Sequence, residues 1–204
     1  MAGTVETMSH RQWNYTIQYH PIVLRTVPVG CQRALDVGCG TGLVTRGLAS
    51  RSESVIGIDV DPEVLSLARS FPELESSIQY LEGDVMTYPF LPATFDFITA
   101  VAALHHLPLR PALARFRDLL KPGGTLAVVG LFRSQTLGDF ASDAVAMPIS
   151  RILRVARGCA HPPTRKQAPQ DTLADIGSAC DALLPGAVVR RLLLFRYALI
   201  WRKC

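Results

Sequence analysis

Three alternating glycines follow a short apolar run near the start of the chain. The run at residues 34–37 leads into Gly38, Gly40 and Gly42. Glycine tolerates positive φ and allows close backbone approach, so a glycine-rich loop at a strand end is suited to binding a ligand. The spacing is G-x-G-x-G, with Leu43 where the dinucleotide fingerprint G-x-G-x-x-G has its third glycine. The loop indicates a ligand site but does not identify the ligand.

Three aspartates stand where successive apolar runs end. Asp36 and Asp59 lie at the ends of two such runs, and Asp84 follows a third. Carboxylates at one sheet edge can accept hydrogen bonds from ribose hydroxyls and an adenine amino group and can balance a cationic amine, but they repel a pyrophosphate. Asp59 is placed to bind a ribose and disfavours a ribose 2′-phosphate. The alternative is that the three acids only cap helices or turns.

The elements that must position these residues follow an alternating pattern, which is typical of an α/β fold with a parallel sheet. Strands are expected at residues 34–37, 55–59, 78–81, 95–100 and 125–132. Asp61 followed by Pro62 predicts a helix from there to about Ser70. Further expected elements are helices at 111–120 and 171–184, a turn at 121–124, and an antiparallel hairpin of 188–195 with 197–203.

Taken together, these motifs resemble the class I S-adenosylmethionine-dependent methyltransferases, especially the small enzymes that act on metabolites. The resemblance spans residues 30–132 and the final hairpin, and its motifs read ALDVGCGTG at 34–42, VIGID at 55–59, GDV at 83–85, FDFITA at 95–100, LHHL at 104–107 and KPGGTL at 121–126. It implies a Rossmann-like seven-stranded sheet, mostly parallel with an antiparallel last strand, and helices on both faces.

The same resemblance implies a cofactor, S-adenosyl-L-methionine, with S-adenosyl-L-homocysteine as the product. The glycine loop would wrap the methionine part, Asp59 would bind the ribose, and Asp84 would lie beside the adenine amino group. The implied cofactor-binding residues are Asp36, Gly38, Gly40, Gly42, Asp59, Val60, Asp84, Val85 and Val101.

Methyl transfer is an in-line displacement, so its main requirement is to hold the nucleophile about 3 Å from the methyl carbon. A general base helps where the acceptor is a phenol, a hydroxyl or a protonated amine. His105 and His106 are the candidates, because the loop after the fourth strand lies beside the cofactor methyl in related enzymes. Neighbouring residues of an extended loop cannot both point into a site, so at most one is the base. The alternative is that one histidine caps the following helix.

Composition is that of a globular chain. Of 204 residues, 49% are hydrophobic and 19% are charged, with a net charge of +4, which excludes disordered, collagen-like and coiled-coil chains. No run of about 18 apolar residues predicts a membrane span. The first twenty residues lack the apolar core of a secretory signal, so a cytoplasmic location is expected. Five cysteines without metal-ligand spacing are expected to be reduced, and no metal is expected.

A single domain over residues 1–204 is expected. Its parts are an N-terminal arm at 1–29, a cofactor-binding core at 30–132, an inserted cap at 133–170, and a closing helix and hairpin at 171–204. In the arm, Tyr15, Tyr19 or His20 either contacts the methionine end of the cofactor or packs on the sheet edge.

The composition of the predicted cap restricts the class of methyl acceptor. It holds six basic and two acidic residues, which suits an acidic substrate or an ordinary solvated helix face. Phe140 is its only aromatic residue, which disfavours RNA. Residues 100–103 read AVAA, where enzymes that methylate base amines or amides carry an Asn/Asp-Pro-Pro-aromatic sequence. A small and largely apolar acceptor, with an acidic one also open, is therefore expected, and the sequence does not specify an oligomeric state.

Two other functions compete with this one. A nicotinamide-dependent oxidoreductase would bind its nucleotide at the same kind of glycine loop and strand-end acid. Leu43 in place of the third glycine and the presence of Asp84 do not fit such an enzyme. A non-catalytic, methyltransferase-like binding module has no evident need for the intact glycine loop and all three acids.

Overall fold

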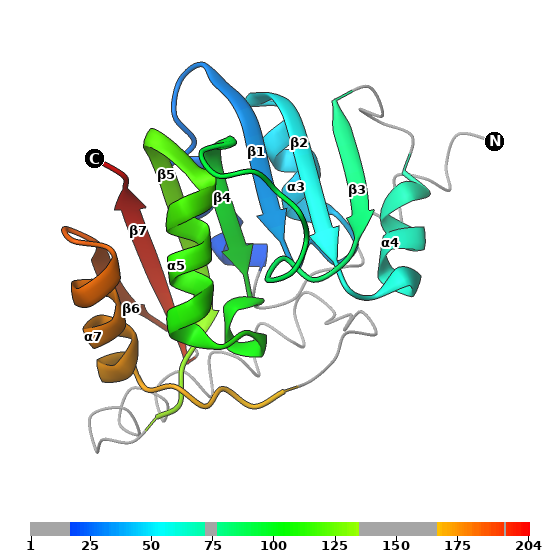
Figure 1. Cartoon of the computed structure of the whole chain (residues 1–204). Helices are drawn as coiled ribbons and strands as arrows, with labels where there is room; N and C mark the ends of the chain where they lie inside the picture. The colour runs from blue at the N-terminus through cyan, green and yellow to red at the C-terminus, as the bar shows by residue number, and fades with distance from the viewer. Residues whose placement is uncertain (1–16, 72–76, 135–166, 194) are drawn as a thin grey trace.

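The computed structural model describes residues 17–71, 77–134, 167–193 and 195–204, and these contain one seven-stranded sheet (Figure 1). Its strands are β1 Cys31–Val37, β2 Ser52–Asp59, β3 Ile78–Glu82, β4 Phe95–Val101, β5 Leu120–Leu131, β6 Val188–Leu192 and β7 Arg196–Arg202. Their spatial order is β3-β2-β1-β4-β5-β7-β6. The pairs among β1 to β5 are parallel, whereas β7 is antiparallel to both β5 and β6. The expected sheet, with its antiparallel last strand, is confirmed.

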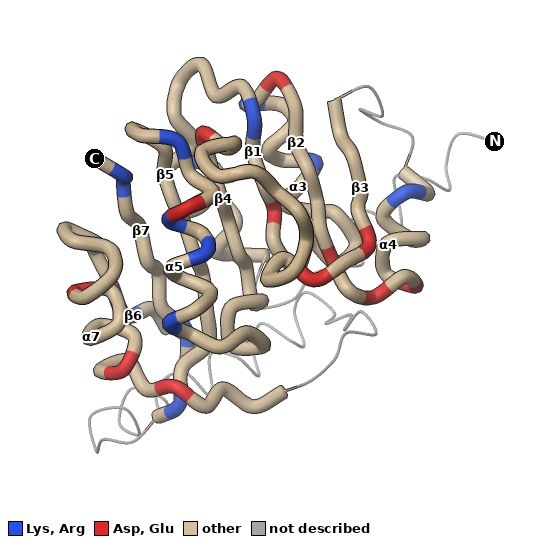
Figure 2. Tube along the Cα trace, viewed as in Figure 1, with Lys and Arg blue, Asp and Glu red and all other residues tan. Residues whose placement is uncertain are grey.

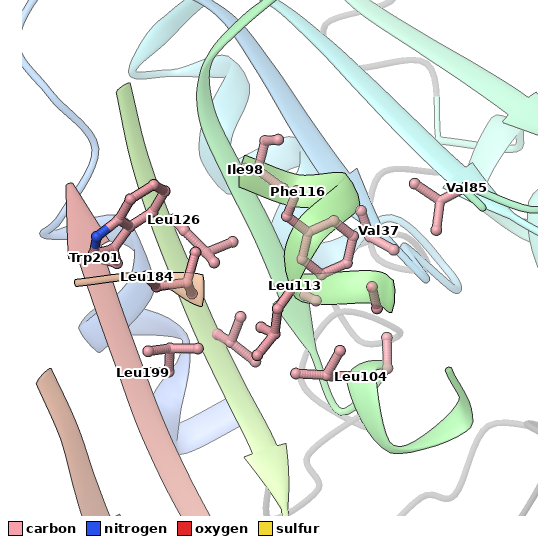
Figure 3. Close-up of a cluster of buried hydrophobic side chains, with 14 of the residues drawn as sticks. Val37, Val85, Ile98, Leu104, Leu113, Phe116, Leu126, Leu184, Leu199 and Trp201 are labelled. Carbon is pink, nitrogen blue, oxygen red and sulfur yellow. The ribbon is translucent and has the colours of Figure 1, made fainter. Parts of the chain in front are cut away.

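Helices cover both faces of the sheet, as expected. They are α2 His20–Leu24, α3 Leu43–Ala49, α4 Pro62–Arg69, α5 Leu109–Leu119 and α7 Leu173–Leu183, with the 3-10 turns η1 Ile17–Tyr19 and η2 Leu104–His106. One apolar core packs α5 and α7 against the sheet; Figure 3 shows Leu113 and Phe116 of α5 over Ile98 and Leu126. The other core packs Val23 of α2 and the α3 residues Val44 and Leu48 on the opposite face. Successive strand residues serve different faces, because side chains alternate along a strand.

Helix starts follow local capping chemistry. Asp61 caps α4 as predicted, because its Oδ1 accepts a hydrogen bond of 2.9 Å from the backbone N–H of Glu63. The capping box of Thr172 and Asp175 starts α7 two residues after the predicted position 171. Helix α5 begins at Leu109, two residues before the predicted position 111, since proline is tolerated in the first turn of a helix.

The predicted turn at 121–124 is wrong in one respect, because these residues belong to β5. Leu120 already pairs with Phe95, and the register shifts before Thr125 pairs with Phe97. Gly123 and Gly124 bond to the backbone of Lys203, with N···O distances of 2.8 and 2.9 Å. The segment bulges while it stays attached to the sheet, which explains why its glycines resemble a turn in the sequence.

The closing hairpin is confirmed: β6 and β7 pair from Val188 with Ile200 to Leu192 with Arg196. Most of the predicted N-terminal arm and of the predicted cap at 133–170 lies outside the described residues. Within the described ranges, each helix is too short or too polar to cross a lipid bilayer.

Candidate functional site

The strand order brings the three predicted acids to one edge of the sheet. Asp36 stands near the end of β1, Asp59 ends the neighbouring β2, and Asp84 follows β3 by two residues. In Figure 2 acidic positions gather where β2 and β3 end. The N–H of Gly83 donates a 2.9 Å hydrogen bond to the backbone carbonyl of Asp59, which ties the β3 loop to β2. Carboxyl ends of parallel strands are where such sheets bind ligands.

All three glycines of the loop after β1 adopt positive φ: 66° for Gly38, 52° for Gly40 and 74° for Gly42. A Cβ on Gly38 would lie 2.5 Å from the Cβ of Ala103, and one on Gly42 would overlap the ring of Tyr80. A Cβ on Gly40 would meet nothing within 4 Å. The outer two glycines therefore permit internal packing, whereas Gly40 faces open space.

Asp59 connects the glycine loop to the end of β2. Its Oδ2 accepts a 2.8 Å hydrogen bond from the N–H of Gly40, and its Oδ1 accepts one of 3.0 Å from the N–H of Asp61. A carboxylate has about four acceptor positions, so this half-buried group keeps capacity for two further donors. Val60 follows it with 55% of its surface exposed and presents an apolar side chain beside the acid.

Asp36 is only 1% exposed. The hydroxyl of Thr45 donates a 2.6 Å hydrogen bond to its Oδ2. Burial raises the pKa of Asp36 to about 7, and the charge of Asp59 adds to this effect, while the Thr45 hydrogen bond opposes it. A nearby cation would stabilise the ionised form of this carboxyl group.

Asp84 is exposed and starts a tight turn. Its Oδ1 accepts a 2.9 Å hydrogen bond from the N–H of Met86, and its backbone carbonyl accepts one of 2.8 Å from Tyr88. Val85 turns inward and is 3% exposed in the core under α5, where Figure 3 shows it beside Val37.

The loop after β4 lies next to the glycine loop. Val101 ends β4, and Ala102 adopts a φ of 54°, a left-handed conformation that is uncommon outside glycine. The N–H of Ala102 donates a 2.7 Å hydrogen bond to the carbonyl of Val129, which holds this conformation. Backbone strain of this kind costs about 1–3 kcal/mol and clusters at functional sites.

The two candidate histidines share a 3-10 turn but differ in environment. Their ring centroids are 4.0 Å apart. Nδ1 of His105 is buried without a hydrogen-bond partner among the described residues. Burial, with the charges of His106 and Arg196, lowers the pKa of His105 to about 4. His106 is exposed, and its Nδ1 lies 3.3 Å from Oε1 of Gln167.

The part of the arm that the structure describes packs against the sheet. The hydroxyl of Tyr19 donates a 2.9 Å hydrogen bond to the carbonyl of Leu193, next to the β6–β7 hairpin. Burial lowers the pKa of the neighbouring His20 to about 4, so its imidazole is neutral at neutral pH. Tyr15 lies outside the described residues.

Several residues that hold the candidate site in place belong to no motif that could be identified in the sequence. Thr45 and Arg46 lie in α3, directly after the glycine loop, and the guanidinium of Arg46 donates a 2.9 Å hydrogen bond to the carbonyl of Thr41. Arg115 of α5 bonds to the turn that follows Asp84. Their contacts depend on tertiary placement, which residue spacing does not report. The described residues hold no cluster of three or more His, Cys, Asp or Glu side chains suited to a metal ion.

Comparison with known proteins adds the family context. A family model described as a methyltransferase domain matches residues 35–128. An uncharacterised methyltransferase of Mycobacterium tuberculosis is 38% identical over 191 residues, which cover 93% of this chain and 96% of that protein. A ubiquinone biosynthesis O-methyltransferase of Xanthomonas campestris is 40% identical over 107 residues, or 50% of this chain and 44% of that protein.

Solved structures share the fold. A SAM-dependent methyltransferase from Methanosarcina mazei superposes with a TM-score of 0.64 at 23% identity, covering 90% of this chain and 97% of that one. The YcgJ protein of Bacillus subtilis gives a TM-score of 0.64 at 19% identity, covering 86% of this chain and 71% of that one.

Proposed function

The chain belongs to the class I S-adenosylmethionine-dependent methyltransferases, and from this premise we propose that it methylates an O, N or C nucleophile of a small molecule. One observation carries the cofactor part of the proposal: Oδ2 of Asp59 accepts a 2.8 Å hydrogen bond from the N–H of Gly40, so the acid that we assign to the ribose and the glycine loop form one unit. Membership of this family also argues against the alternative function, a nicotinamide-dependent oxidoreductase.

The residues at the sheet edge fit S-adenosylmethionine. Asp59 has acceptor capacity for two ribose hydroxyls, and the exposed Asp84 has a second carboxylate oxygen for the adenine amino group. The buried Asp36 suits a cationic amine, and the open space at Gly40 allows the ligand to approach the backbone. The proposed contact set is completed by Gly38, Gly42, Val60, Val85 and Val101.

When bound, the cofactor supplies a sulfonium methyl group for in-line displacement. What remains for the protein is to hold the acceptor atom about 3 Å from that methyl and collinear with the sulfur, and to exclude water. The strained Ala102 directs the chain from β4 into η2, which places the two histidines on the loop beside the glycine loop. Positioning by this loop is the main catalytic contribution that we propose.

Of the two histidines, His105 is the one we assign to proton transfer. It is neutral at neutral pH, because burial lowers its pKa to about 4, so it can accept a proton from the acceptor. His106 is exposed and contacts Gln167, which suits a supporting role. An imidazole with so low a pKa is a weak base, so this role requires an acceptor that is itself acidic, such as a phenol or an activated carbon acid.

Two relatives support a small-molecule acceptor. One is named a ubiquinone biosynthesis O-methyltransferase and the other, from Thermosynechococcus vestitus, a 2-phytyl-1,4-naphtoquinone methyltransferase; each matches 50% of this chain. The charge of Arg196 also acts on the pKa of His105, after burial and the charge of His106, so a cation lies near this histidine. An acceptor with acidic character is compatible with that neighbour.

The proposal is tested by calorimetric titration of the purified chain with S-adenosylmethionine and S-adenosylhomocysteine, with NAD(H) as the control. Micromolar binding of the first pair and none of NAD(H) is expected, followed by formation of S-adenosylhomocysteine with a member of a phenol, quinol, amine and carboxylate panel. Binding of NAD(H) alone would reject the cofactor assignment. Cofactor binding without turnover on any acceptor would favour a non-catalytic module.

A further inference from the structure

The turn that carries Asp84 is held from behind by Arg115 of α5. The guanidinium of Arg115 donates a 2.6 Å hydrogen bond from Nη2 to the carbonyl of Tyr88. Longer contacts reach the carbonyl of Val85, 3.4 Å from Nε, and that of Phe90, 3.5 Å from Nη2. One half-buried cation therefore collects three backbone carbonyls of the segment 85–90.

One peptide unit connects this guanidinium to Asp84. The peptide between Val85 and Met86 faces Arg115 with its carbonyl oxygen, at 3.4 Å, and donates its N–H to Oδ1 of Asp84, at 2.9 Å. A cation at the carbonyl end polarises the peptide and strengthens its N–H as a donor, because consecutive hydrogen bonds reinforce each other. Arg115 thus acts on the orientation of the Asp84 carboxylate without touching it.

We propose that Arg115 is a positioning residue that sets the selectivity of the site for the adenine amino group. The inference rests on the proposed function, in which the second oxygen of Asp84 accepts a hydrogen bond from that amino group. The N–H of Met86 fixes Oδ1, and this also sets the direction of Oδ2. An Oδ2 held in one direction can accept a hydrogen bond from an amino group on the base, whereas it repels an oxo group at the same position.

Apolar packing holds the same turn independently, so loss of Arg115 leaves the fold in place. The rings of Tyr88 and Phe90 have centroids 4.5 Å apart, and Phe90 packs edge-on against the buried Phe95 at 5.3 Å. Val85 is buried beneath α5. Removal of the guanidinium is therefore expected to loosen the backbone orientation of the turn more than its attachment to the core.

Helix α5 also offers a matched control. Arg117 has the same side chain two residues along, and its guanidinium is paired with Asp118 at 2.9 Å. Arg117→Gln removes the same charge from the same helix without touching the turn after Asp84.

The test compares S-adenosylhomocysteine with S-inosylhomocysteine, in which an oxo group replaces the adenine amino group. Dissociation constants are measured by calorimetry for the wild type, Arg115→Gln and Arg117→Gln, with thermal unfolding recorded for each. The wild type is expected to prefer the adenosyl ligand by about 10- to 100-fold, as for a charge-assisted hydrogen bond. In Arg115→Gln this ratio is expected to fall to about threefold or less, and in Arg117→Gln it is expected to stay unchanged.

A purely structural role would weaken both ligands equally, because they share the ribose and the methionine part, and would leave the ratio intact. An unchanged ratio in Arg115→Gln therefore overturns the inference while the cofactor assignment stands. A wild type that binds both ligands equally overturns the assignment of Asp84 to the amino group and this inference with it. If Arg115→Gln does not fold, Arg115→Lys serves, since one retained carbonyl bond predicts an intermediate ratio, and a wild-type ratio there rejects the inference.

Discussion

The hydroxyl of Thr45 lies 2.6 Å from Oδ2 of Asp36, at a point where the carboxyl group is 1% exposed. Asp36 in β1 and Thr45 in α3 flank the glycine loop in the sequence, and the pKa of Asp36 is raised to about 7. A substantial fraction of Asp36 is thus protonated near pH 6.5 in the free protein. An α-ammonium group bound nearby favours the ionised form and expels this proton.

We therefore expect S-adenosylhomocysteine to release protons when it binds at pH 6 to 7. The release is measured by calorimetry in two buffers that differ in ionisation enthalpy. Asp36→Asn removes the titrating group, so the buffer dependence should disappear, whereas Asp118→Asn on the exposed side of α5 should retain it. The same proton release in Asp36→Asn would place the titrating group elsewhere.

His20 makes a prediction about stability and pH. Its pKa falls from 6.5 to about 4 on folding because the imidazole is buried. The unfolded chain then binds the proton more readily than the folded chain, so the contribution of the neutral imidazole is complete above pH 6.5 and is lost as the pH falls toward 4.

The check is urea unfolding of the wild type and His20→Gln at pH 7.5 and pH 4.5. The variant loses the proton-linked term, so the free energy of unfolding should fall less between the two pH values than in the wild type. His106→Gln, at an exposed position on η2, is the control. Parallel losses in His20→Gln and the wild type would show that His20 does not titrate with folding.

Much of this site could be predicted from the apolar runs that mark the strands. The exact ends of the strands could not, as β1 shows. β1 begins at Cys31, three residues before the predicted position 34, because Cys31 and Arg33 still pair with β2 although Arg33 is exposed. The apolar pattern marks the buried part of a strand, whereas the hydrogen-bonded ladder extends beyond it. Motif residues could therefore be placed at the sheet edge from the sequence.

The supporting contacts could not be predicted in this way. Thr45 bonds to Asp36 only because the loop between them turns back at three glycines with positive φ. Arg115 reaches Tyr88 across 27 residues of chain, and its position in α5 resembles that of any arginine on a half-exposed helix face. The environments of His105 and His106, which separate their proposed roles, also depend on tertiary contacts.

Asp59 is expected to dominate cofactor affinity. Asp59→Ala removes the acceptor for the ribose and also releases the N–H of Gly40, so S-adenosylhomocysteine should bind more than about tenfold more weakly. Glu82→Ala is a matched control, because Glu82 pairs with Asp59 in register, is exposed, and ends the neighbouring strand. The control should change affinity by less than about twofold. Calorimetric affinities that agree between wild type and Asp59→Ala would reject the ribose assignment.

Alanine at Gly38 is expected mainly to lower the stability of the protein, whereas alanine at Gly40 is expected mainly to weaken ligand binding. Gly40→Ala meets no atom within 4 Å, so it carries only the strain of a φ of 52°, about 1–2 kcal/mol, yet its methyl group enters the space proposed for the ligand. Gly38→Ala adds a contact of 2.5 Å with Ala103, which costs about 1–3 kcal/mol more.

These variants are compared by urea unfolding and by titration with S-adenosylhomocysteine. Gly38→Ala should be the less stable of the two, and Gly40→Ala should lose affinity by about tenfold or more while its stability falls only by the strain of about 1–2 kcal/mol. Retained affinity in Gly40→Ala would mean that the ligand does not approach the backbone there.

The two histidines should differ sharply in turnover. His105→Gln removes the neutral imidazole proposed to accept the proton and should lower kcat by about 100-fold, at the lower end for a general base. His106→Gln changes an exposed side chain that contacts Gln167 and should lower kcat by less than about threefold. Both variants should keep the KM for S-adenosylmethionine, since neither is assigned to the cofactor. The rate is followed as S-adenosylhomocysteine formed with the best acceptor of the panel. Equal losses in the two variants would mean that the histidines support the loop together and that neither transfers the proton, leaving catalysis to positioning alone.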